Sequence, residues 1–183
     1  AALVAGKRVL LGYSGGVDSH VLLYELTRVA SMHRIKIVAL HGNHQMLPKS
    51  DQWEQHCRQV CQKIGVEFRS HRLPVNFDRA GGRENVLREA RYAWFKSVMN
   101  PGDVLATAHH LDDQIETVLF RLFRGSGVRG LTGIAPARKW GKGELYRPFR
   151  DLWRSDILAF AEQHHLEWVE DESNRDESFD RNF

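Results

Sequence analysis

The chain contains a glycine-rich turn, Ser14-Gly15-Gly16-Val17-Asp18-Ser19, whose residue types suit the binding of a phosphate. Glycines let the backbone bend tightly and approach an anion, and the first N–H groups of a following helix point at that anion. Ser14 and Ser19 add hydroxyl donors, and Asp18 supplies a carboxylate that suits a magnesium ion. The turn lacks both the Gly-Lys-Ser/Thr of a Walker A loop and the spacing of a dinucleotide fingerprint. We therefore expect a phosphate site of another class.

Histidines and carboxylates form a second group of chemically capable residues. His109 and His110 directly precede a segment of helical spacing that carries Asp112, Asp113 and Glu116. Carboxylates in the first turns of a helix also suit its dipole, and Asp112 fits that supporting role best. Two adjacent histidines are harder to explain as packing. This cluster is therefore a candidate site for acid–base chemistry.

The elements that position these residues alternate between strand and helix patterns. Short apolar runs predict strands at 9–13, 34–40, 66–71, 104–108 and 144–148, and helical spacing predicts helices near 20–30, 51–64, 83–99, 111–122 and 155–165. Such alternation is typical of an α/β fold with a doubly wound, mainly parallel five-stranded sheet and helices on both faces. Ligands of such sheets bind at the carboxyl ends of the strands. The phosphate turn, the segment from His41 to His44 and the His109 cluster all follow predicted strands, so we expect them at that edge.

Composition and cysteine placement narrow the class of protein. The 183 residues are 42% hydrophobic, with 26 Lys and Arg against 23 Asp and Glu, which fits one mildly basic globular domain. No apolar stretch approaches the ~20 residues that span a membrane, and the first residues lack a secretory pattern. Cys57 and Cys61 share one helical face with apolar residues and have no nearby partner ligands, so we expect them in the core of a cytoplasmic protein.

A strand followed by this turn resembles the PP-loop of the ATP pyrophosphatases, which cleave ATP to AMP and pyrophosphate while adenylating a substrate. Further stretches resemble, in family order, the N-terminal catalytic domain of the tRNA(Ile)-lysidine synthetases. They are His41-Gly42-Asn43-His44, 84–92, 108–117, 124–127, 147–148, 170–174 and 179–182. The resemblance implies that 1–183 is one PP-loop catalytic domain with an adenine nucleotide alpha hydrolase-like fold. The C-terminal tRNA-binding domains of the family are absent from this chain. The segment after His44 departs from the Gly-Leu-Arg usual there, which removes one expected arginine contact.

The same resemblance implies a ligase reaction and its partners. ATP would adenylate the carbonyl at position 2 of the first anticodon cytidine of the minor isoleucine tRNA, which carries a CAU anticodon. The ε-amine of free L-lysine would then displace AMP and leave lysidine. ATP and Mg²⁺ are the implied cofactors, and a homodimer is a candidate assembly.

The resemblance also assigns roles to residues. Asp113 and Glu116 would anchor the lysine amine, one of them acting as its base, and Arg88 or Arg91 would steady the activated base or the phosphate. Arg181 would reach in from the tail, and Asp18 would hold the metal. The implied catalytic residues are Asp18, Arg88, Arg91, His109, Asp113, Glu116 and Arg181. The implied nucleotide-binding residues are Ser14, Gly15, Gly16, Val17, Asp18, Ser19, His41 and His44.

Two other functions compete with this interpretation. A tRNA thiolase of the same superfamily, of the 2-thiocytidine type, needs a nucleophilic cysteine or a cysteine-held iron–sulfur cluster, and the two cysteines lie on a predicted core helix. A nucleotide-binding sensor without chemistry would not need His109, Asp113 and Glu116 at the strand edge. The histidines lack the ligand spacing of a metal site.

Overall fold

Six strands form one sheet in the computed structural model, which describes residues 4–45, 48–73, 83–125 and 132–169. Their order is β3-β2-β1-β4-β6-β5, and every neighbouring pair is parallel except β5 with β6. The strands are β1 Arg8–Gly12, β2 Lys36–Asn43, β3 Glu67–Arg72, β4 Val104–Ala106, β5 Ala137–Trp140 and β6 Gly143–Tyr146. The sequence-based prediction of a doubly wound, mainly parallel α/β sheet is confirmed.

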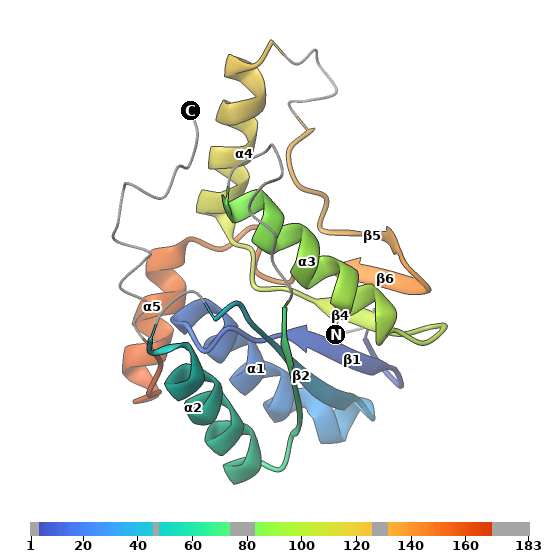
Figure 1. Ribbon diagram of the computed structural model, residues 1–183, viewed down its shortest axis with the longest axis vertical. Helices are drawn as coiled ribbons and strands as arrows, with labels where there is room; N and C mark the ends of the chain where they lie inside the picture. Colours follow the sequence, from blue (N-terminus) through green and yellow to red (C-terminus); the bar gives the residue numbers. More distant parts are fainter. Residues whose placement is uncertain (1–3, 46–47, 74–82, 126–131, 170–183) are drawn as a thin grey trace.

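Helices cover both faces of this sheet, as expected (Figure 1). Helices α1, α2 and α5 pack on one face, and α3 packs on the other. Helix α4 starts just beyond the carboxyl end of β4, and Figure 1 shows it extending away from the sheet. The helices are α1 Val17–His33, α2 Ser50–Lys63, α3 Arg83–Ser97, α4 Leu111–Phe123 and α5 Arg154–Gln163.

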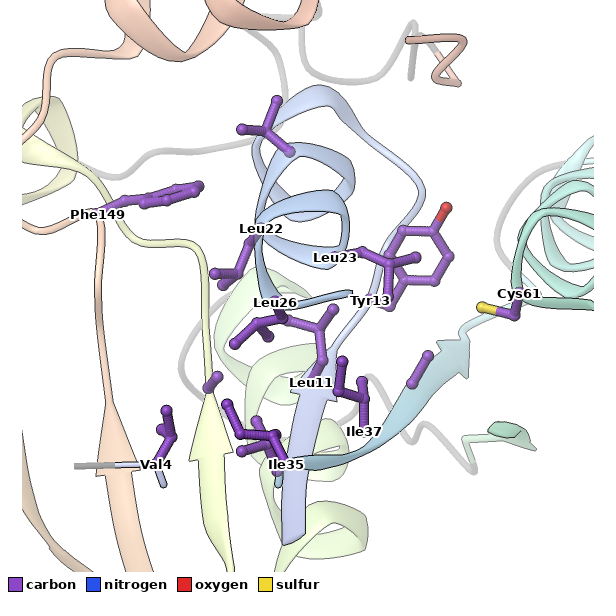
Figure 2. Packing of buried hydrophobic residues seen from close by; sticks show 14 of the residues in the cluster. Val4, Leu11, Tyr13, Leu22, Leu23, Leu26, Ile35, Ile37, Cys61 and Phe149 are labelled. Atoms are coloured by element: carbon purple, nitrogen blue, oxygen red, sulfur yellow. The ribbon is translucent and has the colours of Figure 1, made fainter. Parts of the chain in front are cut away.

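Alternation along β1 divides the core into two layers. Val9 and Leu11 join the cluster beneath α1, α2 and α5, whereas Leu10 joins the cluster beneath α3. Figure 2 shows the first cluster, in which Leu22 and Leu26 of α1 pack over β1. Both faces of a parallel sheet are thereby buried, which explains why its strands read as continuous apolar runs. The core holds the carboxyl end of β1 and the turn after it in place.

One strand and several element boundaries differ from the sequence-based prediction. Strand β5, which pairs antiparallel with β6, was not predicted, so the sheet has six strands where five were expected. Strand β2 continues through Asn43, because His41–Asn43 pair with the last residues of β3, whereas a loop was expected there. Strand β4 ends at Ala106. Helix α5 begins at Arg154 with Trp153 as its N-cap, so the predicted cap, Ser155, lies inside the helix.

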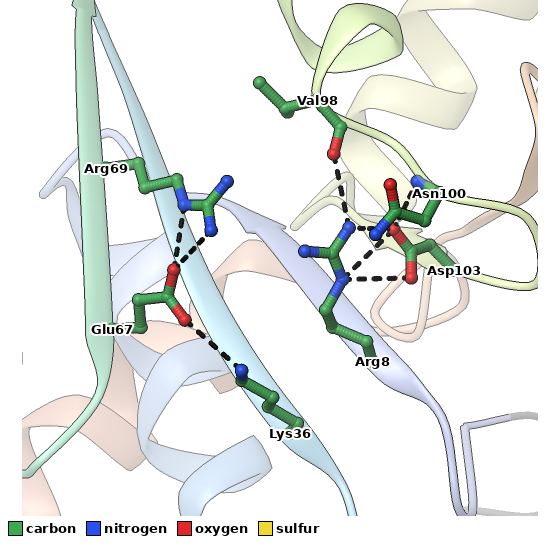
Figure 3. A network of polar contacts seen from close by, with 7 residues as sticks. All are labelled: Arg8, Lys36, Glu67, Arg69, Val98, Asn100 and Asp103. Carbon is green, nitrogen blue, oxygen red and sulfur yellow. Dashed lines mark hydrogen bonds and ion pairs between the residues drawn. The ribbon is translucent and has the colours of Figure 1, made fainter.

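Charged residues stabilise the opposite edge of the sheet, at the amino ends of the strands (Figure 3). Arg8 donates two hydrogen bonds to the Asp103 carboxylate through Nε, and its guanidinium also forms an ion pair with that carboxylate. Burial is the largest single influence on Asp103 and opposes its ionisation, but the hydrogen bonds from Arg8 and from the Asn100 backbone, with the charge of Arg8, together lower the pKa of that carboxyl. Among the described helices, none is long and apolar enough to cross a membrane.

Candidate active site

The glycine-rich turn after β1 is shaped by the hydroxyl of Ser19. This oxygen accepts the backbone N–H groups of Ser14 and Gly15, each at 3.2 Å, and donates to the carbonyl of Gly16 at 3.0 Å. Gly15 adopts a φ of 91°, and a Cβ there would lie 2.7 Å from Sγ of Cys57. Only glycine fits such a position without strain. Ser19 therefore holds the turn together, in addition to the ligand contact expected from the sequence.

Helix α1 begins directly after this turn without a side-chain cap. Its N-cap is Gly16, and Val17 and Asp18 are its first two residues. The first N–H groups of an uncapped helix point outward along the axis, and the helix dipole adds partial positive charge there. Local geometry therefore supports the anion site that the sequence predicts at Ser14–Ser19.

Asp18 lies in the first turn of α1 and has an unusual environment. Its Oδ1 is buried and has no hydrogen-bond partner, and its Oδ2 lies 3.8 Å from Nε of Arg154. Burial raises the pKa of Asp18, while His110 and Arg154 act in the opposite direction. An orphaned carboxylate oxygen next to a phosphate site fits Mg²⁺, which usually takes one or two carboxylates and completes its shell with phosphate oxygens and water. Among the described residues there is no group of three or more His, Cys, Asp or Glu side chains that could hold a metal ion.

The start of α4 is held by a reciprocal capping box. His110 is the N-cap, and its backbone N–H donates to Oδ2 of Asp113 at 2.8 Å. Nδ1 of the buried His110 lies 3.5 Å from a carboxylate oxygen of Asp112 and from one of Asp113. Asp112 accepts the backbone N–H of Arg154 at 3.0 Å, a contact compatible with the supporting role expected of it. The amino ends of α4 and α5 are thus tied together beside Asp18.

Arg154 is a candidate site residue that sequence reasoning did not assign, and His110, which the sequence placed in the histidine–carboxylate cluster, received no role of its own there. Arg154 is the first residue of α5, where the positive end of the helix dipole disfavours a cation. This mismatch between a positive side chain and the helix dipole is the sequence signal that could have identified Arg154. For His110 the signal was its position next to His109, but its role depends on the cap geometry that places Asp112 and Asp113 around its ring.

His109 is a neutral imidazole at physiological pH. Burial lowers its pKa to about 4; Asp113 raises it, and the cations Arg147, Arg88 and Arg91 lower it. Its Nδ1 lies 2.9 Å from the hydroxyl of Thr107, which orients the ring. A neutral ring of this kind orients a substrate by hydrogen bonding better than it carries a proton.

His41 and His44 stand at the end of β2 and have different environments. Nδ1 of His41 is hydrogen-bonded to the carbonyl of Tyr13 at 3.0 Å, so His41 fixes the chain where β1 enters the turn. Nδ1 of His44 is buried without a partner, and burial lowers its pKa to about 4, with Arg91 acting in the same direction. Arg91 acts on both histidines and on His109, which places all three in one neighbourhood.

The other catalytic residues predicted from the sequence are Glu116, Arg88 and Arg181. Glu116 is exposed on the second turn of α4, three residues after Asp113 and therefore on the same side of the helix. Arg88 lies over the ring of Tyr92, with 5.8 Å from the guanidinium carbon to the ring centre. Arg181 lies outside the described residues.

Both cysteines are fully buried, as the sequence predicts. Cys57 and Cys61 lie on the buried face of α2, and Cys57 lies beneath the phosphate turn. Burial raises the pKa of each thiol to about 12. Neither thiol is therefore a nucleophile at neutral pH.

Comparison with known proteins agrees with this combination of fold and site. A family model described as "PP-loop domain" matches residues 2–183, and the chain belongs to this family. Its curated relatives include the tRNA(Ile)-lysidine synthase of Coxiella burnetii, 40% identical over 181 residues, and that of Pseudomonas syringae pv. tomato, 45% identical over 174 residues. These alignments cover 99% and 94% of the chain. The chain spans 40% and 39% of the two relatives' own lengths.

Solved structures with more distant sequences share the fold. The U34-tRNA thiolase NcsA from Methanococcus maripaludis, described with its [4Fe-4S] cluster, superimposes with a TM-score of 0.76 at 20% identity. That match covers 92% of this chain and 60% of the thiolase. The NH3-dependent NAD synthetase of Campylobacter jejuni gives a TM-score of 0.52 at 15% identity, over 93% of this chain and 72% of the synthetase. At such identities the likeness concerns the fold alone.

Proposed function

We propose that this chain is the catalytic part of a ligase that joins L-lysine to the first anticodon cytidine of the minor isoleucine tRNA, using ATP. One observation carries the proposal: the phosphate turn and the acidic start of α4 are joined through Asp18, Arg154 and Asp112. A site for activating a substrate and a site for an amine therefore lie side by side. The relatives named tRNA(Ile)-lysidine synthase support this assignment.

Activation of the cytidine is the first step. The O2 oxygen of the base attacks the α-phosphorus of ATP, a P–O bond to pyrophosphate breaks, and the base becomes adenylated. The N–H groups at the start of α1 and the guanidinium of Arg154 neutralise the charge that grows on the leaving pyrophosphate. A magnesium ion held by Asp18 would supply further neutralisation of the phosphates.

Attack by lysine is the second step. The ε-amine adds to C2 of the base, the C2–O bond breaks and AMP leaves, so one proton must leave the amine. Glu116 and Asp113 lie on one side of α4 and are the proposed acceptors. Because Asp113 already accepts the His110 N–H, Glu116 is the better base and Asp113 the better anchor. The neutral ring of His109 and the arginines Arg88 and Arg91 orient the activated base.

Thiolation is the alternative with structural support, because the thiolase of M. maripaludis shares the fold. Sulfur transfer requires a nucleophilic thiolate or a cysteine-held cluster. Cys57 and Cys61 are fully buried on α2, and burial raises the pKa of each thiol to about 12. The cysteines of this chain therefore favour ligation over sulfur transfer.

Incubation with labelled lysine distinguishes these functions. The protein that contains this chain is supplied with ATP, radiolabelled L-lysine and an isoleucine tRNA transcript with a CAU anticodon. We expect lysine to be retained in the RNA, with one AMP and one pyrophosphate released per lysine. Sulfur incorporation from a donor without lysine retention would establish a thiolase instead. ATP binding with no RNA product under either condition would establish a nucleotide sensor.

We also propose the cytoplasm as the compartment, because this reaction needs free lysine, ATP and tRNA. The homodimer is a further proposal, and sedimentation of the intact protein tests it.

A further inference from the structure

Arg147 is a buried cation directly after β6, at the carboxyl edge of the sheet. Its side chain is among the most buried polar groups, with 6% of the residue exposed. Nη1 donates to the carbonyl of Ala135 at 2.8 Å, and Nε is buried with no hydrogen-bond partner. A buried guanidinium with an orphaned N–H is costly to the fold unless something else satisfies it.

Arg8 shows how the same fold neutralises a buried arginine. Its side chain is 18% exposed, and the carboxylate of Asp103 accepts from its Nε and forms an ion pair with it. At Arg147, within the described part of the chain, no comparable carboxylate acts on the guanidinium. The neighbouring charges are those of Arg138 and Arg88, which are of the same sign. The acceptor beside Arg147 is the neutral hydroxyl of Tyr92.

The location of Arg147 connects it to the proposed active site. Ala106 of β4 is in register with Tyr146 of β6, and the N–H of Thr107 donates to the carbonyl of Tyr146 at 3.0 Å. The residues that follow the two strands, Thr107 and Arg147, are therefore neighbours. The hydroxyl of Thr107 contacts His109, and the charge of Arg147 acts on His109. Positive charge thus lies on the β6 side of His109.

We propose that Arg147, flanked by Arg88, binds an oxyanion that a substrate carries into the site, an inference that rests on the proposed function. The chemistry admits two sources: the α-carboxylate of the amino acid and the phosphate of the nucleotide. Both accept hydrogen bonds from a guanidinium in a forked geometry. Asp113 and Arg147 act on His109 with opposite charge, which suits a substrate that carries both an amine and a carboxylate. The bound anion would supply the counter-charge that Arg147 does not receive from the residues the structure describes.

Calorimetry with ligand pairs that differ only in the anionic group tests this site. Lysine is compared with 1,5-diaminopentane, which lacks the carboxylate, and AMP is compared with adenosine, which lacks the phosphate. In Arg147→Met we expect at least a tenfold loss of affinity for lysine or for AMP, while the member of that pair that lacks the anionic group binds as before. The pair that responds identifies the source of the anion. Arg147→Lys keeps the charge and should keep part of the preference.

Arg138→Met is the matched control, because it removes a nearby exposed positive charge from β5. We expect it to leave both ligand preferences unchanged. Because Arg147→Met removes an uncompensated buried charge, its melting temperature should equal or exceed that of Arg138→Met. Failure of Arg147→Met to fold, or a much lower melting temperature, would show a structural role and overturn the proposal.

The outcomes separate this inference from the proposed function. Suppose that the unsubstituted protein binds lysine and AMP, and that Arg147→Met still prefers lysine to 1,5-diaminopentane and AMP to adenosine. The oxyanion site is then wrong and the proposed function stands. If the unsubstituted protein binds neither AMP nor lysine, with or without ATP and tRNA, the proposed function is wrong and the oxyanion site fails with it.

Discussion

In the proposed reaction, Arg154 and Asp18 form the contact to which we assign the activation of ATP. Nε of Arg154, in the first turn of α5, lies 3.8 Å from Oδ2 of Asp18, in the first turn of α1. The backbone N–H of Arg154 donates to the carboxylate of Asp112, which fixes its position. An arginine held at a helix start beside a phosphate turn acts against the helix dipole, so a fold-stabilising role is a poor explanation for it. A role in binding the triphosphate explains both its charge and its position.

Replacing Arg154 with glutamine should weaken the binding of ATP more than the binding of AMP. Loss of a charged hydrogen bond to the outer phosphates corresponds to roughly a tenfold to hundredfold loss of affinity for ATP. Arg28→Gln is the matched control, since both side chains are 54% exposed and Arg28 pairs with Glu25 elsewhere on α1. Titration calorimetry with ATP and with AMP provides the measurement. Equal weakening of the two nucleotides would show that Arg154 merely supports the fold of the site.

Replacing Glu116 with glutamine should separate the two chemical steps. Removal of the proposed base should slow lysine transfer by about 10²–10⁴-fold, while pyrophosphate release upon activation of the RNA stays within a few-fold. Rapid-quench assays that follow pyrophosphate and RNA-bound lysine in the same reaction measure both steps. Glu162→Gln, an exposed change on α5, is the control. A parallel loss of both steps would contradict the role given to Glu116.

At the scale of elements, the turn between β1 and α1 is built against α2. A Cβ on Gly15 would contact Sγ of Cys57, and the positive φ of Gly15 would strain any other residue. Cys57 is fully buried on α2, so the face of that helix sets the space beneath the turn. The cysteine therefore contributes to the phosphate site through its size and not through its chemistry.

Gly15→Ala should both destabilise the protein and impair ATP binding. The left-handed φ alone costs roughly 1–2 kcal/mol, and the contact with Cys57 adds to it. Gly65→Ala is the control for the backbone conformation, because Gly65 has a φ of 69° and nothing lies within 4 Å of a Cβ there, so it should destabilise the protein without impairing ATP binding. Denaturant unfolding and ATP titration measure the two effects. The double change Gly15→Ala with Cys57→Ala should recover only the stability that the contact with Cys57 costs. Full recovery of the free energy of unfolding would show that the left-handed φ of Gly15 carries no strain.

The elements that carry the site were predictable from the sequence where the pattern is local. The turn at Ser14–Ser19, the buried strands and the position of α4 follow from glycines, apolar runs and helical spacing. Strand β5 was not predictable, because three of its four residues are exposed and its pattern does not alternate. The contact of Arg154 with Asp18 joins residues far apart in the chain, and only tertiary structure brings them together.

At the scale of the whole molecule, buried neutral histidines couple the site to stability. Burial holds the pKa of His109 and of His44 at about 4, below the ordinary value of 6.5. Above pH 6.5 both are neutral in the folded and the unfolded chain. As the pH falls from 6.5 towards 4, the unfolded chain takes up protons that the folded protein excludes, so stability is lost in this window.

The free energy of unfolding should therefore decrease between pH 7 and pH 5, with His109 contributing on the order of 2 kcal/mol. His109→Gln removes the titrating ring and should flatten this dependence, whatever its effect on stability at pH 7. Urea denaturation at a series of pH values measures the slope of the free energy of unfolding against pH for the unsubstituted protein and for His109→Gln. Equal slopes for the two proteins would show that His109 titrates alike in the folded and unfolded states.

The order of the two steps tests the central claim most directly. The intact protein is incubated with ATP labelled at the α-phosphate and with tRNA transcript, first without lysine and then with a lysine chase. We predict that labelled AMP first becomes attached to the RNA, and that lysine then releases it as free AMP while becoming attached to the same RNA. Asp18→Asn should form neither product. Labelled AMP found on lysine, with none on the RNA before the chase, would contradict the account.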